Sequence, residues 1–275
     1  MAIGLVRSEF GGVAVHSDPE LLRSHGIVVA FSERTGGRSE SPFESLNLAA
    51  HVGDSPSCVD DNRAVLMSAL GIERLRDRLT VPEQVHGLIA REVAGAMAGM
   101  GAFARSCAPP PVPATDALYT VQADIPLMLC FADCVPVVLV ATGPVRGVAV
   151  VHAGWRGALG CLPVQAARRL ALTCGCEMSQ ILAYIGPHIG ACHYEVGPEV
   201  LSQFTGAFGS IAAAQGRLDL GAVVSESLNG VGVLFSSQVR LGACTAERTD
   251  SFYSYRTDGL TGRHGALACI LGSNR

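Results

Sequence analysis

The sequence is poor in charged and aromatic side chains. Of its 275 residues, 16% are charged and 5% are aromatic, whereas 49% are hydrophobic. The formal net charge is only −4, and no block of basic residues stands out. A chain with this much apolar material can bury a sizeable core, which argues against intrinsic disorder. The absence of a basic block makes nucleic acid an unexpected partner.

Long apolar runs are also missing. No run approaches the ~20 residues that a bilayer span requires, and residues 1–20 lack a basic stretch followed by an apolar core. We therefore predict no membrane span, no signal peptide and a cytoplasmic location. The ten cysteines are sparse for a disulfide framework, and Cys130 and Cys269 lie in apolar segments. We expect most cysteines to be reduced residues of the core.

Strand clusters separated by single helices organise the chain, without an internal repeat. Apolar runs such as "VPVVLVA" (135–141), "RGVAVVHA" (146–153) and "RHGALACILG" (263–272) predict strands, and "RLTVPEQVHG" predicts a short strand ending near His86. "DSPSCVDDNRAVLMSALGI" predicts a helix with Ser57 as its N-cap. The prolines at 109–113 predict a loop. This pattern favours mixed sheets with helices outside them, in one domain over residues 1–275.

Three candidate metal ligands stand at the ends of predicted strands: His86 in "EQVHG", Cys134 in "ADC" and His152 in "VHAGW". Their spacings of 48 and 18 residues are not those of a zinc finger. Neighbouring strands can still bring such residues together, and catalytic zinc sites commonly use three protein ligands. A thiolate also suits copper(I). Taken singly, each histidine has an equally ordinary interpretation as a hydrogen-bonded structural residue.

Other polar residues in apolar surroundings are candidate substrate contacts. Arg156 follows His152 in "AGWRG", where a guanidinium fork suits phosphate or carboxylate. Asn47 in "SLNLAAHVGD" and Arg63 in "DDNR" are further candidates, although a turn cap and a solvated helix arginine would look the same. The glycine-rich segment "GPHIGACHYEVG" carries His188 and His193, and either lines a pocket or forms a surface loop.

A nucleophile is the competing interpretation of the same residues. Cys134 and His152 could form a thiolate–imidazole pair. Asp133 is adjacent to Cys134, so on a regular strand the two side chains point to opposite faces. Asp133 is therefore a poor partner for the same imidazole unless the strand ends there.

Five ordered motifs resemble one known family: "VPEQVHG", "FADCVPVVL", "VHAGWRG", "IGPHIGACHYEVG" and "SFYSYRTDGLTGR". They are similar to those of the multicopper polyphenol oxidase, or laccase-domain, family, from about Gly26 to the C-terminus. The resemblance implies an α+β fold, a layered α/β/β/α sandwich with mixed sheets. It also implies a metal, usually zinc, held by His86, Cys134 and His152, which then act in catalysis.

The activity implied by the resemblance differs from the family name. Members characterised as enzymes are purine nucleoside phosphorylases that act on adenosine, inosine, guanosine and methylthioadenosine with inorganic phosphate, and they also deaminate adenosine. For the phosphate we expect Asn47 and Arg63, with Arg156 third. Two enzymatic alternatives stay open: a copper-dependent polyphenol oxidase, for which eight histidines are few, and a metal-independent cysteine hydrolase or amidase using Cys134 and His152. A binding module is a third.

Overall fold

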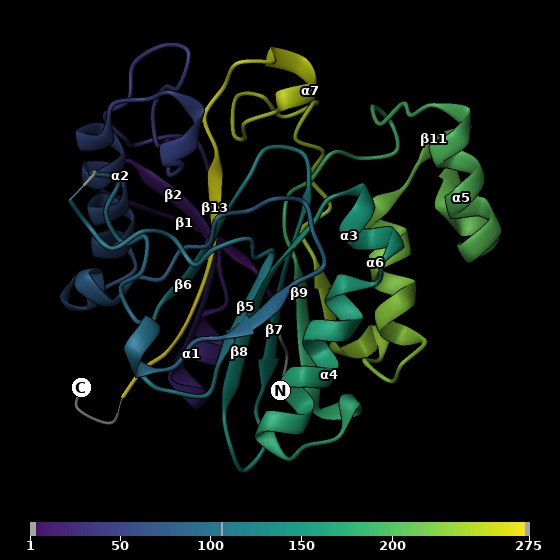
Figure 1. Cartoon of the computed structure of the whole chain (residues 1–275), viewed down its shortest axis with the longest axis horizontal. Helices are drawn as coiled ribbons and strands as arrows, with labels where there is room; N and C mark the ends of the chain where they lie inside the picture. Colours follow the sequence, from purple (N-terminus) through teal and green to yellow (C-terminus); the bar gives the residue numbers. More distant parts are fainter. Residues whose placement is uncertain (1–3, 106, 215, 273–275) are drawn as a thin grey trace.

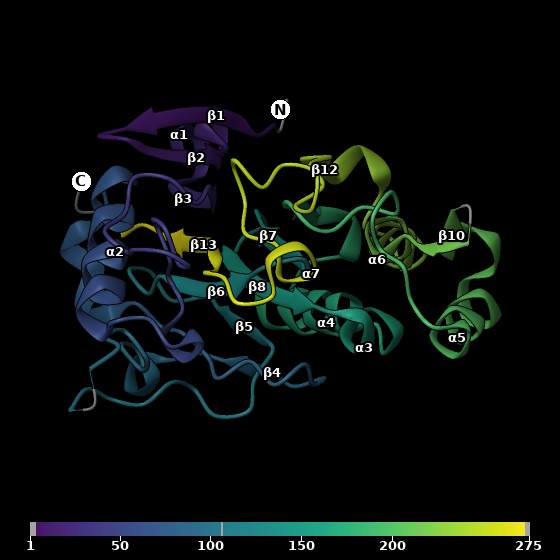
Figure 2. The ribbon, with the colours of Figure 1, turned by 90° about the horizontal axis from the view of Figure 1, so that it is seen from above.

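Two β-sheets lie face to face at the centre of the molecule, and helices cover their outer faces (Figures 1 and 2). The computed structural model describes residues 4–272 except 106 and 215. The first sheet is antiparallel throughout, in the order β1 (Val6–Phe10), β2 (Val13–Ser17), β3 (Ile27–Ser32), β13 (His264–Ile270) and β6 (Leu127–Phe131). The second sheet has the order β12 (Gln238–Arg240), β9 (Ile181–Ile185), β7 (Val135–Ala141), β8 (Gly147–Ala153), β5 (Ala117–Thr120) and β4 (Ala90–Glu92). It is mixed, because its outer pairs β12–β9 and β4–β5 are parallel.

Helix α2 (Pro56–Ala69) covers the first sheet, and α4 (Leu162–Cys174) with α6 (Leu220–Asn229) covers the second. Figure 2 shows these helices on opposite sides of the paired sheets. The structure also describes α1 (Pro19–His25), α3 (Trp155–Leu159), α5 (Pro198–Phe208), α7 (Tyr255–Asp258), β10 (Ala213–Ala214) and β11 (Arg217–Leu218), together with short 3-10 helices. The predicted layered α+β sandwich is confirmed. Within the described residues, no helix has the length and apolar character that would let it cross a membrane.

The core has three layers, because side chains alternate along each central strand. On β7, Val138 and Val140 pack between the two sheets, and on β8 so do Val148 and Val150. The residues between them pack on the other face, toward α4. His152 has the same parity as Val148 and Val150, so the strand directs its ring into the space between the sheets.

Local structure follows the sequence in most places and departs from it in two. The segment before His86 makes only isolated bridges, Thr80 with Leu127 and Pro82 with Val112, and is not the predicted strand. Helix α2 begins after Ser55, so Ser57 lies inside its first turn and is not the N-cap. The prolines at 109, 110, 111 and 113 are exposed in a loop, as predicted.

Candidate active site

Cys134 and His152 meet because β7 and β8 form an antiparallel pair. The register places Val135 opposite Ala153 and Pro136 opposite His152. Cys134 immediately precedes β7, so it lies beside the last residues of β8. Both side chains belong to the inter-sheet face, and the polar ring of His152 is satisfied there by the Asp116 carboxylate.

His86 reaches this pair from a loop that Asp116 holds in place. The backbone N–H groups of Val85, His86 and Gly87 donate to the Asp116 carboxylate at 3.2, 3.0 and 2.7 Å. These bonds stabilise the left-handed backbone of His86, whose φ is 57°. The same carboxylate lies 2.8 Å from Nδ1 of His152. One buried aspartate therefore positions both histidines.

The donor set fits a metal ion. The ligand atoms of His86, Cys134 and His152 lie within 4.8 Å of one another. Because Nδ1 of His152 faces Asp116, its Nε2 is the nitrogen available for coordination. Gly154 leaves the necessary space, since a Cβ there would lie 3.0 Å from Sγ of Cys134 and 3.1 Å from Cδ2 of His86. One thiolate and two imidazoles match a zinc site with an open fourth position.

Electrostatics favour a thiolate at Cys134. Burial opposes ionisation, but the charge of His152 and hydrogen bonds from both histidines outweigh it and lower the pKa of Cys134 to about 6. Burial likewise opposes the charge on His152, whereas the Cys134 thiolate and the Asp116 carboxylate raise the pKa of His152 to about 9. Without metal the two residues therefore form a thiolate–imidazolium pair near neutral pH, and a bound cation would replace the imidazolium proton.

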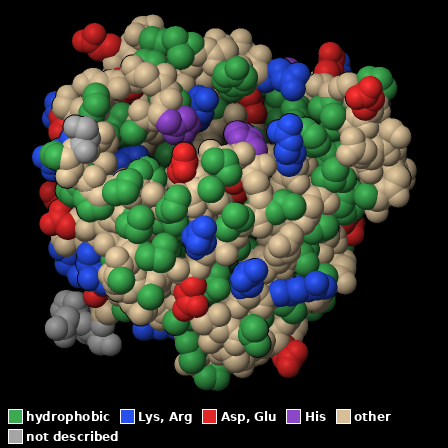
Figure 3. All heavy atoms as spheres, in the orientation of Figure 1, with side chains coloured by type: hydrophobic (Ala, Val, Ile, Leu, Met, Phe, Trp, Pro, Cys, Tyr) green, Lys and Arg blue, Asp and Glu red, His purple; other side chains and the backbone are tan. Residues whose placement is uncertain are grey.

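Three arginines line the same cavity, whose volume is about 390 Å³. The guanidinium of Arg156 lies 4.3 Å from the ring of Trp155, and that of Arg256 lies 5.2 Å from the ring of Tyr194. Arg263 is the third arginine of the lining. The sequence contains no lysine, so arginine alone supplies the fixed positive charge. In Figure 3, histidine and basic side chains surround a hollow on this face.

The structure does not bring Asn47 and Arg63 into the cavity lining. Both are buried. Asn47 accepts from the backbone N–H of Arg263 at 2.9 Å and donates to Asp54 at 2.8 Å. Arg63 donates to the carbonyl oxygens of Leu48, Gly101 and Ala102. Their polar groups are thus engaged in holding the loops around the site, and of the three expected phosphate contacts only Arg156 faces the cavity.

Among the residues that line or order this cavity, His51, Asp116, Arg256 and Arg263 were not predicted from the sequence. Their signals were weak: a histidine in "SLNLAAHVGD", a carboxylate at the start of the predicted strand "TDALYTVQ", and two arginines inside the "SFYSYRTDGLTGR" motif. Asp133 does not orient the imidazole. Its backbone has a φ of 92°, and its carboxylate accepts from Thr245, Ser254 and the backbone N–H of Arg256 at 2.6–2.7 Å. It thereby fixes the segment that carries Arg256.

The "GPHIGACHYEVG" segment contributes Tyr194 to this cavity. His188 and His193 are not among the lining residues. His188 lies instead at a separate cavity on the far side of the segment, which also exposes Cys192. The segment is therefore part of the pocket wall, but through an aromatic side chain and not through its histidines.

Comparison with known proteins agrees with this architecture. The model of the family described as multi-copper polyphenol oxidoreductase laccase matches residues 28–271. The purine nucleoside phosphorylase YlmD of Geobacillus stearothermophilus is 35% identical over 248 residues, 86% of this chain and 88% of that protein. The purine nucleoside phosphorylase SCO2081 of Streptomyces coelicolor is 35% identical over 244 residues, 87% and 93% of the two chains. The crystal structure of Geobacillus YlmD superposes with a TM-score of 0.88 at 31% identity, covering 98% of this chain and 100% of that one. The chain belongs to the multi-copper polyphenol oxidoreductase laccase family.

Proposed function

We propose that this protein is a purine nucleoside phosphorylase that also deaminates adenosine, with adenosine, inosine, guanosine and methylthioadenosine as substrates. The observation that carries the proposal is a single cavity whose lining holds both a Cys/His/His ligand set and three arginines. The named phosphorylases at 35% identity support the first activity. Deamination is inferred from the ligand set, which suits the activation of water.

Phosphorolysis breaks the bond between C1′ of ribose and the purine nitrogen, and forms a bond between C1′ and a phosphate oxygen. Phosphate carries about two negative charges near neutral pH, so it needs fixed cations that do not compete as acids. We assign this role to Arg156, Arg256 and Arg263. The rings beside Arg156 and Arg256 restrict where each guanidinium lies, which reduces the entropy lost on binding.

The departing purine must gain a proton or a hydrogen bond at the nitrogen that leaves the sugar. His51 lines the cavity and is not one of the three metal-ligand candidates. Burial and the nearby Arg263 lower the pKa of His51, which favours the neutral imidazole. A neutral imidazole can still donate an N–H hydrogen bond, and we assign this contact with the leaving purine to His51 because it lines the cavity.

His86, Cys134 and His152 would hold zinc, with copper as the alternative occupant. Once bound, such an ion supplies Lewis-acid chemistry and activates water for attack on the purine carbon that bears the amine. The protein's own contribution is to keep Cys134 as a thiolate and to present Nε2 of His152 through the bond from Nδ1 to Asp116.

The test is product analysis of purified protein incubated with adenosine, with and without phosphate, at defined zinc loading. Adenine that appears only with phosphate demonstrates phosphorolysis, and inosine that appears in either condition demonstrates deamination. Arg156→Met should raise the KM for phosphate. The proposal fails if neither adenine nor inosine forms at any metal loading.

A metal-independent cysteine hydrolase is a second candidate, which one observation favours. Cys134, His152 and Asp116 form a thiolate, imidazole and carboxylate series, with 2.8 Å between Nδ1 of His152 and the carboxylate. This is the arrangement of a cysteine nucleophile with its base and the group that orients the base. Hydrolysis of amide substrates that survives complete chelation but is lost in Cys134→Ser would establish this activity. Loss of all activity on chelation would exclude it.

A further inference from the structure

A second thiol and imidazole cluster lies outside the cavity described above. Nδ1 of His193 is 3.1 Å from Sγ of Cys192 and 3.6 Å from Sγ of Cys244. The three ligand atoms all lie within 4.8 Å of one another. The cluster adjoins a separate cavity of about 200 Å³, and the two cavities have no lining residue in common.

The fold builds this cluster from two segments that leave the second sheet side by side. Strands β9 and β12 are parallel neighbours, so the chain exits both at the same end. Beyond the strands, His188 N–H donates to the carbonyl of Ala243 at 3.3 Å, and Thr245 N–H donates to the carbonyl of His188 at 3.0 Å. Cys244 is therefore held in register with the turn that presents Cys192 and His193.

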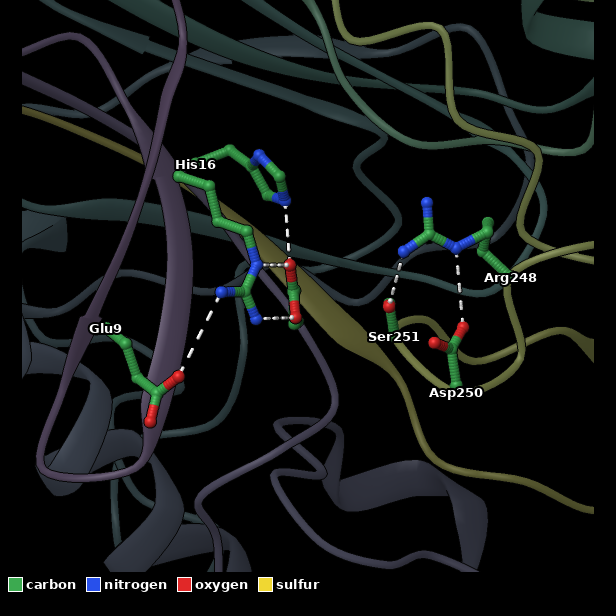
Figure 4. Close-up of polar contacts among 7 residues, drawn as sticks. Glu9, His16, Arg248, Asp250 and Ser251 are labelled. Atoms are coloured by element: carbon green, nitrogen blue, oxygen red, sulfur yellow. Dashed lines mark hydrogen bonds and ion pairs between the residues drawn. The ribbon is translucent and has the colours of Figure 1, made fainter.

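The segment that follows Cys244 is ordered by contacts of its own. The backbone N–H of Arg248 donates to the carbonyl of Cys244 at 2.9 Å. Its guanidinium lies 3.2 Å from Oγ of Ser251 and 3.4 Å from the Asp250 carboxylate (Figure 4). Cys244 thus sits on a preformed loop, and it is buried, while Cys192 and His193 are exposed and open to an entering ion.

The geometry matches a tetrahedral thiophilic ion. With Zn–S bonds of about 2.3 Å and Zn–N bonds of about 2.0–2.1 Å, neighbouring sulfur and nitrogen ligands lie about 3.6 Å apart. The observed 3.1 and 3.6 Å need only a small adjustment. The backbone N–H of Gly190 donates to Sγ of Cys244 at 3.2 Å, which stabilises a thiolate. Asp219 and Glu247 also line the cavity, together with Arg240.

We propose that Cys192, His193 and Cys244 form a second metal site, which binds Zn²⁺ and clamps together two loops, one that lines the first cavity through Tyr194 and one that is bonded to Asp133 of its lining. Each of the two loops is connected to the first cavity by the residue that follows a proposed ligand. Tyr194, the residue after His193, lines the first cavity. Thr245, the residue after Cys244, donates to Asp133 at 2.7 Å, beside Cys134. The site is independent of the proposed phosphorylase activity, since none of its ligands lines the first cavity.

Zinc stoichiometry of the full chain tests the proposal. Protein loaded with excess Zn²⁺ under reducing conditions and then dialysed should retain two equivalents. Cys192→Ser and His193→Ala change exposed residues, so both variants should fold, and each should retain one equivalent. Cys58→Ser, a thiol in α2 away from both clusters, is the matched control and should retain two. Two equivalents in Cys192→Ser, or one in the parent protein and none in Cys134→Ser, would overturn the proposal.

The absorption spectrum of bound Co²⁺ tests the second site without an activity assay and without a measurement of metal stoichiometry. Cys134→Ser removes the thiolate ligand of the first site, so thiolate-to-cobalt charge-transfer absorption that depends on Cys192 reports the second cluster. This absorption should appear in Cys134→Ser and vanish when Cys192→Ser is added. If the reduced protein takes up no second ion, and mild oxidation instead joins Cys192 to Cys244 in a disulfide, the cluster is a redox pair and the metal proposal is wrong.

Discussion

His264 should make the folded protein sensitive to mild acid. This residue begins β13 and is fully buried between aromatic rings, with Phe131 stacked at 6.4 Å and Phe252 edge-on at 5.5 Å. Among the described residues, neither ring nitrogen has a partner at hydrogen-bonding geometry. Burial lowers the pKa of His264 from 6.5 to about 3, against a weaker opposing effect of the Pro187 backbone.

The sign and size of the effect follow from proton linkage. Between pH 6.5 and about 3, the unfolded chain binds a proton at this histidine and the folded chain does not. Stability is therefore fully present above pH 6.5 and decreases by about 1.4 kcal/mol for each unit below it. At about pH 4.5 the loss is about 2.7 kcal/mol, or roughly 5–10 °C in Tm for a chain of this size.

The assay compares denaturant unfolding of metal-free parent protein and His264→Met from about pH 7.5 to 4.5. The variant lacks the titrating ring, so its stability should not fall through this pH range as that of the parent does. The difference should then grow as the pH falls through the range set by His264. His193→Gln, which changes an exposed histidine, should follow the parent. Parallel profiles for parent and His264→Met would refute the reasoning.

Three further predictions concern the candidate active site. Asp116→Asn should weaken zinc binding by about 10–100-fold, because His152 loses the carboxylate that orients it; competition with a chromogenic chelator measures this. Arg156→Met should raise the KM for phosphate about 10-fold at unchanged Tm, whereas Arg63→Met should lower stability by about 1–3 kcal/mol through unpaired carbonyls and leave that KM unchanged; steady-state kinetics and unfolding separate the two. Alkylation of Cys134 in metal-free protein should stay fast down to about pH 6 and slow below it, and zinc should block it; a rate that keeps falling from pH 8 to 6 would contradict the thiolate assignment.

The sandwich could be predicted because the local sequence of its central strands is enough to identify them as buried strands. Continuous apolar runs at 135–141 and 147–151 specify buried strands, and both faces of these strands are covered, as such composition requires. Cys134 and His152 flank these runs, so recognising the runs was enough to place the two residues at strand ends. The predicted and observed positions of Cys134 and His152 agree because strands β7 and β8 determine where these two residues lie.

The local sequence could not predict the position of residues that are held by partners far away in the chain. His86 owes its position to Asp116, 30 residues further along, and nothing in "VPEQVHG" indicates that a carboxylate will bind three successive backbone N–H groups. Asn47 and Arg63 show the converse error. A polar side chain among apolar neighbours predicts that the group has a partner, but not whether that partner is a ligand or the protein's own backbone.

Strand register explains why the site depends so closely on the β7–β8 pair. His152 faces the inter-sheet space because it shares parity with Val148 and Val150. A slip of one residue would turn His152 toward α4 and place Ala153 in the site. Such a slip is opposed by packing, because it would exchange Val148 and Val150 with Ala149 and Val151 and so change the side-chain volume on both buried faces of β8. The apolar residues of β7 and β8 therefore fix the strand register, and the register decides which side chain of "VHA" lies beside Cys134.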